Sequence, residues 1–188
     1  MTARHWLQSY SDTPADINAD RYTSVVELLE GAMQRYAGLP AFRSFGKTLT
    51  YAEVDTLSAG FCAYLQHELA VKKGDRIAIM LPNLLQYPIA IVGAHRAGCV
   101  VVNVNPLYTA RELEHQLKDS GAKDMLMVEN FATTMQQVIN AVPTKKVILT
   151  ALGDMLGFPK SLIVNYVVRK VKKMVPAYEL PGAVRFND

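Results

Sequence analysis

Short apolar runs that alternate with helix-like stretches are the feature that most constrains the fold of this chain. Each run has the length of a strand, and the stretches between the runs have apolar residues at helical spacing. The runs cover residues 76–81, 99–104, 124–128 and 145–150. Strands that are apolar throughout and alternate with helices are typical of a parallel sheet covered on both faces. We therefore predict an α/β fold, a doubly wound and mostly parallel sheet with helices on both faces.

Capping boxes mark the starts of three expected helices. In each, a serine or threonine is followed three residues later by a glutamate, and the two side chains can satisfy free backbone N–H groups. The boxes begin at Ser24, Thr50 and Thr109. We expect the helices to run to about residues 37, 69 and 120, with Gly121 stopping the last one.

The remaining patterns complete the expected organisation. Helical spacing covers residues 84–97 and 130–141, and Gly46 lies in the middle of a small β-hairpin expected at residues 42–50. Residues 1–21 are polar and are expected to form an N-terminal arm. Residues 22–188 are expected to form a single domain or the first part of one.

Cysteine use and hydropathy predict the compartment. Cys62 and Cys99 lie in apolar surroundings and belong to no CxxC pair, which is typical of free thiols in a reducing compartment. The N-terminus lacks a signal-peptide pattern, and no stretch reaches the ~18 apolar residues needed to span a bilayer. We expect a cytoplasmic protein, with peripheral attachment to the inner face of the membrane as a further option.

Positive charge gathers near the C-terminus. The formal net charge is +3, and the segment 155–175 holds five basic residues and no acidic one. They are Lys160, Arg169, Lys170, Lys172 and Lys173. The excess is therefore local, and nucleic acid is not expected as a partner.

The sequence lacks the common motifs of catalysis. It contains no GxGxxG, no GxxxxGK[ST] and no GxSxG, and its four histidines show no metal-ligand spacing. The residues alone assign neither a catalytic group nor a metal site. They are compatible with a non-catalytic α/β module that binds a membrane or a nucleotide.

Several segments, in order and in register, resemble one family. They are LTYAEV at 49–54, KGDRIA at 73–78, LPN at 81–83, RAGCVVVNVNPLYT at 96–109, and residues 112–122. Together they are similar to the opening of the adenylate-forming superfamily, which contains acyl-CoA synthetases, luciferases and peptide-synthetase adenylation domains. The form NVNPLYT and the basic segment 152–178 resemble bacterial long-chain fatty acid–CoA ligases. Another acyl- or aryl-CoA synthetase of the superfamily is the alternative.

The resemblance implies a two-step reaction. ATP and a fatty acid give an acyl-adenylate, and CoA then displaces AMP, with Mg²⁺ assisting the phosphate chemistry. In the family, a Ser/Thr/Gly-rich loop ending in lysine holds the phosphates, and a C-terminal domain supplies a catalytic lysine. Neither occurs before Asp188. We expect residues 22–188 to be the first part of the AMP-binding N-terminal domain, inactive in isolation and, through exposed core surface, able to form a homodimer.

The resemblance also suggests a binding site. The corresponding turn of CoA-forming relatives lies near the CoA nucleotide, so Asn105, Pro106 and Leu107 are candidate CoA-binding residues. The turn follows an apolar strand and precedes the helix capped by Thr109, whose N-terminus favours anions. The alternative is a purely structural strand-to-helix connection.

The segment 162–175 predicts an amphipathic helix. Its valines share one face, and Arg169, Lys170, Lys172 and Lys173 lie opposite them or beside them. This pattern is typical of a helix on an anionic membrane surface, with the four basic residues facing the lipid. The alternative is that the valines pack on the chain's own domain and the basic residues are solvated.

Overall fold

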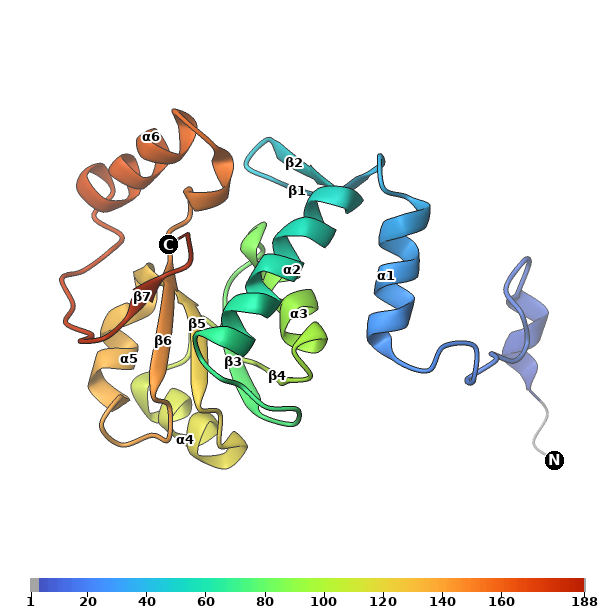
Figure 1. The fold of residues 1–188 in the computed structure, drawn as a ribbon, viewed down its shortest axis with the longest axis horizontal. Coiled ribbons are helices and arrows are strands. Elements are labelled where there is room, and N and C mark those ends of the chain that lie inside the picture. The colour runs from blue at the N-terminus through green and yellow to red at the C-terminus, as the bar shows by residue number, and fades with distance from the viewer. Residues whose placement is uncertain (1–3, 188) are drawn as a thin grey trace.

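A computed structural model describes residues 4–187 and contains a five-stranded parallel sheet (Figure 1). The strand order is β4-β3-β5-β6-β7, and all four neighbouring pairs are parallel. The strands are β3 (Arg76–Met80), β4 (Val100–Asn103), β5 (Asp124–Val128), β6 (Lys146–Thr150) and β7 (Val184–Arg185). The predicted doubly wound, parallel α/β fold is therefore confirmed.

Helices cover both faces of this sheet (Figure 1). On one face, α2 (Tyr51–His67) and α3 (Gln86–Arg96) cover the sheet, and α1 (Val25–Arg35) packs against these two helices. On the other face lie α4 (Ala110–Ser120) and α5 (Ala132–Val138).

The two faces explain why the strands are apolar throughout. Ile77 and Ile79 of β3 belong to the core under α2 and α3, whereas Ala78 and Met80 belong to the core under α4 and α5. Every residue of β5 is buried. Because alternate side chains enter different cores, neither face of these strands carries the polar residues of a half-exposed sheet.

The predicted helix starts are confirmed. Thr50 and Thr109 form complete capping boxes, and the Ser24 hydroxyl accepts a hydrogen bond from the backbone N–H of Glu27. The first two helices end at Arg35 and His67, two residues earlier than predicted, and α4 ends at Ser120 as predicted. Its C-cap, Gly121, has φ of 66°, a left-handed conformation that glycine adopts at low cost.

The expected hairpin is also present. Strands β1 (Pro40–Ser44) and β2 (Lys47–Thr50) are antiparallel, and their turn places Phe45 at φ 48° and Gly46 at φ 76°. Two consecutive positive φ angles are the requirement of a type I′ hairpin turn, although an aromatic residue there is uncommon. This turn holds the Phe45 side chain 53% exposed.

The two ends of the chain differ in how they join this core. The short η1 helix (His5–Ser9) has no buried residue and lies away from the sheet (Figure 1). After β6 come η3 (Asp154–Leu156), α6 (Lys160–Tyr166) and the π-helical segment η4 (Val167–Val171), before the chain returns as β7. Within residues 4–187, none of the helices has both the length and the apolar character needed to cross a bilayer.

Candidate functional site

A crevice lies at the carboxyl ends of β3, β4 and β5. After β3 the chain turns to α3 on one face, and after β5 it turns through η2 (Glu129–Phe131) to α5 on the other. The strand order reverses at this point, since β4 and β5 flank β3 on opposite sides. In open α/β sheets, ligands bind where connections leave in opposite directions, because the two loops part there and leave a gap. We therefore take this crevice as the candidate site.

The crevice is a mostly apolar cavity of about 570 Å³. Each of its walls comes from a segment that directly follows a strand, apart from one methionine of the segment after η4. The lining residues are Leu81, Pro82, Asn83, Asn105, Pro106, Leu107, Val128, Asn130, Phe131, Leu152 and Met174. The topology of the sheet thus brings together residues that are up to about 90 positions apart in the sequence.

The three residues singled out in the sequence, Asn105, Pro106 and Leu107, all line this crevice. The Asn105 side-chain oxygen accepts a hydrogen bond from the backbone N–H of Leu107 at 3.0 Å, which fixes the turn. Leu107 lies at the edge of the crevice and is 79% exposed. The structure places these residues in a cavity, and CoA as their ligand stays a prediction.

A carboxylate occupies the N-terminus of α4, beside this turn. The backbone N–H and the hydroxyl of Thr109 both donate to Glu112, at 2.8 and 2.7 Å, and these hydrogen bonds lower the pKa of Glu112. The attraction for anions expected of this helix terminus is therefore partly satisfied by the chain itself. The wall beside Leu107 is more suited to an uncharged part of a ligand than to a phosphate.

Sequence reasoning missed Asn130 as a lining residue. Its amide nitrogen donates to the backbone oxygen of Met174 at 3.1 Å, and its buried amide oxygen has no hydrogen-bond partner within residues 4–187. The available signal was an asparagine two positions after the fully buried strand β5. The contact also joins the segment after η4 to the crevice.

The chemistry of the lining limits what the crevice can bind. Among the lining residues there is no titratable side chain, and residues 4–187 contain no cluster of histidine, cysteine or carboxylate groups that could hold a metal ion. Apolar walls with three asparagine amides suit a slender, uncharged chain that carries amide groups. The lining does not suit Mg²⁺ or a polyphosphate, which need carboxylates, cations or clustered backbone N–H groups.

A buried glutamate next to the crevice forms ion pairs with two arginines. Glu129, at the carboxyl end of β5, is 2% exposed. It accepts from Arg169 at 2.6 and 2.9 Å and from Arg185 at 2.7 Å, and Arg185 also donates to the Tyr178 hydroxyl at 3.2 Å. Burial alone would raise the pKa of Glu129, but the hydrogen bonds from the two arginines outweigh burial and the pKa lies below its ordinary value. The cluster ties η4 and β7 to the centre of the sheet.

A second polar network anchors α6. The buried Gln86 side chain donates to the Thr150 hydroxyl at 2.9 Å, and Thr150 donates to Asp154 at 3.0 Å. Asn165 donates to Asp154 at 2.9 Å and accepts from the backbone N–H of Gly153 at 2.8 Å. The Asn165 side chain of α6 therefore points into the domain, and the buried side chains of Gln86 and Thr150 also find partners in this network.

The basic segment differs from the prediction. The expectation that Arg169 faces outward with the lysines is wrong, because its guanidinium is turned inward onto Glu129. Lys170, Lys172 and Lys173 are exposed, and none of the ion pairs within residues 4–187 involves them. The helix wheel placed Asn165 and Arg169 on one face, and the structure keeps them together, but this face turns inward onto Asp154 and Glu129 and does not meet solvent.

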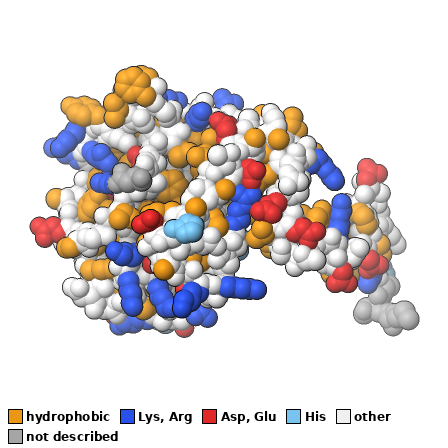
Figure 2. All heavy atoms as spheres, in the orientation of Figure 1, with side chains coloured by type: hydrophobic (Ala, Val, Ile, Leu, Met, Phe, Trp, Pro, Cys, Tyr) orange, Lys and Arg blue, Asp and Glu red, His pale blue; other side chains and the backbone are white. Residues whose placement is uncertain are grey.

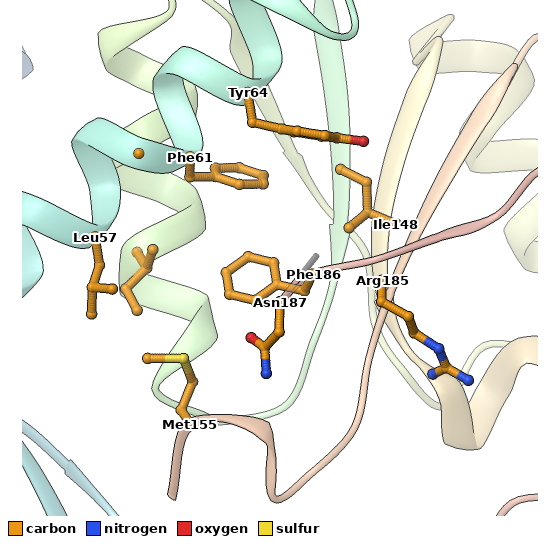
Figure 3. A pocket seen from close by; sticks show the side chains of 10 residues that line it. Leu57, Phe61, Tyr64, Ile148, Met155, Arg185, Phe186 and Asn187 are labelled. Carbon is orange, nitrogen blue, oxygen red and sulfur yellow. The ribbon is translucent and has the colours of Figure 1, made fainter. Parts of the chain in front are cut away.

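A second cavity, of about 420 Å³, lies between α2 and the β6–β7 edge of the sheet (Figure 3). The Phe61 and Phe186 rings face each other there with centroids 5.5 Å apart. The Arg185 side chain lines this cavity but points away from the rings (Figure 3), toward Glu129. The cavity therefore offers apolar packing surface and little to orient a polar substrate.

Comparison with known proteins gives one family. Residues 29–179 match the family described as AMP-binding enzyme. The chain is 53% identical over 184 residues to a long-chain-fatty-acid–CoA ligase of Salmonella typhimurium and 52% identical over 183 residues to one of Yersinia pestis. Each alignment covers 97% of the chain and 33% of the relative, so the chain spans about a third of the length of these curated relatives.

Solved structures support the same fold. The crystal structure of an anthranilate CoA ligase in complex with anthranoyl-AMP superposes with a TM-score of 0.69 at 16% identity. The match covers 89% of the chain and 27% of that protein. At this level of identity, the likeness concerns the fold of the polypeptide.

Proposed function

Since the chain belongs to the AMP-binding enzyme family, we propose that it works as the N-terminal part of an ATP-dependent long-chain fatty acid–CoA ligase. In this role the crevice beyond β3, β4 and β5 contacts the pantetheine arm of CoA during the second step, in which the thiol displaces AMP. ATP and Mg²⁺ are held by residues outside this segment, because the crevice lining does not suit them. The chain by itself then catalyses neither step.

One observation carries the proposal: the turn 105–107 forms part of an apolar cavity at the point where the strand order reverses. Apolar walls bury the methylene groups of a slender arm, and the asparagine amides offer donors and acceptors to its peptide-like groups. The relatives are long-chain-fatty-acid–CoA ligases, so CoA is the matching substrate.

The test uses the longer ligase that contains this segment. We expect Leu107→Asp to raise the KM for CoA about tenfold relative to the KM for the fatty acid. The reason is that the aspartate carboxylate at the edge of the crevice would lose water when CoA binds. The matched control is Leu39→Asp, since Leu39 is also exposed, at 55%, and lies outside the crevice. Steady-state kinetics with varied CoA gives the ratio directly.

An equal change in both KM values, or the same change in the Leu39 variant, would rule out a CoA-specific role for the crevice. Catalysis of acyl-adenylate formation by the chain of 188 residues would refute the assignment of ATP and Mg²⁺ to other segments. That outcome is measured as pyrophosphate release with ATP, fatty acid and the isolated chain.

A further inference from the structure

An apolar rim projects from α6 and from the tip of the β1–β2 hairpin. We define the rim as Phe45, Phe158, Leu162, Ile163 and Tyr166. Their exposed fractions range from 53% for Phe45 to 85% for Phe158. Figure 2 shows large hydrophobic side chains projecting at the upper left, where Figure 1 places α6. Large apolar side chains that gather on one surface are the mark of an interaction site.

The rim exists because α6 and η4 turn the side chains of Asn165 and Arg169 inward. Asn165 bonds to Asp154 and to the backbone of Gly153, and Arg169 bonds to buried Glu129. These contacts fix the rotation of the helix, so Leu162, Ile163 and Tyr166 must point to solvent. The orientation is set by a polar network and is not an accident of loose packing.

The hairpin belongs to the same surface. The Lys160 ammonium, on the first turn of α6, donates to the backbone oxygen of Phe45 at the hairpin tip. The positive φ angle of Phe45 keeps its ring outside the β1–β2 pair. Two elements far apart in the sequence therefore lie next to each other (Figure 1), and both carry large exposed apolar side chains.

Positive charge flanks the rim. The segment 155–178 contains no acidic residue, and the exposed residues Lys170, Lys172 and Lys173 follow the rim residues in the chain, at the end of η4 and directly after it. Largely exposed apolar side chains near unpaired cations match the two contributions to binding an anionic bilayer, which are burial of apolar area and attraction to lipid phosphates. We propose that this rim docks the chain on an anionic lipid surface, with the rim side chains inserted and the three lysines at the headgroups.

Sedimentation with vesicles tests the proposal without any use of ligase activity. The chain should pellet with vesicles of phosphatidylcholine and phosphatidylglycerol, and less with phosphatidylcholine alone. Raising the salt from about 0.05 M to about 0.5 M should weaken the lysine contribution through screening. We expect the rim variant Phe158→Ser/Leu162→Ser/Ile163→Ser to bind about tenfold or more weakly, because it removes most of the inserted area.

Two further variants separate the electrostatic contribution to binding from the apolar one. Charge reversal at Lys170, Lys172 and Lys173 should also weaken binding about tenfold or more, while leaving the apolar rim intact. The matched control Ile17→Ser/Leu28→Ser/Leu39→Ser replaces three exposed apolar residues elsewhere and should bind like the unmodified chain. All substituted side chains are exposed, and a thermal melt of each variant checks that it is folded.

Three results would contradict docking of the rim on lipid. Absence of binding by the unmodified chain, or unchanged binding by the rim variant, overturns the proposal. If the chain does not bind vesicles but self-associates, and the rim variant is monomeric, the occupant of the rim is a second copy and the lipid proposal is wrong. If neither lipid binding nor self-association occurs, the proposal is also wrong, and the rim is left for another segment of a longer protein to cover.

Discussion

Replacing Glu129 with glutamine tests whether the ion cluster holds η4 and β7 on the sheet. The carboxylate is 2% exposed and accepts three hydrogen bonds from Arg169 and Arg185. A hydrogen bond to a charged group contributes about 1.5–3 kcal/mol, so three set an upper limit of about 9 kcal/mol. Glutamine keeps one acceptor, and the arginine side chains are 39% and 43% exposed, so water can solvate them. We expect a loss of about 2–4 kcal/mol in the free energy of unfolding.

The pH dependence gives the prediction a second part. The pKa of Glu129 lies below its ordinary value of 4.5 in the folded chain. Its stabilising contribution is therefore complete above the unfolded pKa and disappears as the pH falls through the folded pKa. The difference in unfolding free energy between the unmodified chain and Glu129→Gln should shrink as the pH falls below about 4.5.

Urea denaturation at pH 7 and at a series of lower pH values measures both quantities. The matched control is Glu114→Gln, which removes an exposed i,i+4 ion pair with Lys118 and should cost about 0.3–0.5 kcal/mol. A loss of less than about 1 kcal/mol for Glu129→Gln, or a difference that does not change with pH, would refute the reasoning.

Three further predictions concern packing, cysteine reactivity and capping. A Cβ at Gly93 would lie 2.8 Å from a backbone oxygen of α2, so Gly93→Ala should lower the free energy of unfolding by about 1–3 kcal/mol. A Cβ at Gly60 meets nothing within 4 Å, so Gly60→Ala should raise the free energy of unfolding by about 0.5–1 kcal/mol. Thermal melts of the two variants test both expectations. Burial, assisted by nearby aspartates, raises the pKa of Cys99 to about 11. Iodoacetamide at pH 8 should therefore label the half-buried Cys62 first, and the buried Cys99 only in denaturant. Mass spectrometry of the labelled chain measures the order. Thr109→Ala removes a complete capping box and should lower the unfolding free energy by about 1 kcal/mol in urea.

Local patterns were sufficient to predict most of the fold. Apolar runs predicted β3 to β6, because burial on both faces removes the need for polar residues, and the hydroxyl–glutamate spacing at Thr50 and Thr109 predicted where helices begin. The turn 105–107 could be placed at the crevice because it follows an apolar strand, and the turns after parallel strands gather at one edge of the sheet.

Long-range contacts could not be predicted in this way. Glu129 pairs with arginines 40 and 56 positions away, and nothing local distinguishes those arginines from solvated ones. The outward face of α6 was predicted incorrectly, since Asn165 and Arg169 were assumed to face solvent, whereas they bond to Asp154 and Glu129 inside the domain. Asn130 was overlooked because its importance comes from a cavity assembled by several strands.

The crossover order of the sheet also bears on how the domain folds. The pairs β3–β4 and β5–β6 each join strands separated by a single α-helix, whereas pairing β5 with β3 must close a longer loop that contains α3, β4 and α4. Closing longer loops costs more chain entropy, so we expect two βαβ units to form early and to dock late through the β3–β5 ladder. The crevice draws its walls from both units, and so it comes into existence only with that last docking event.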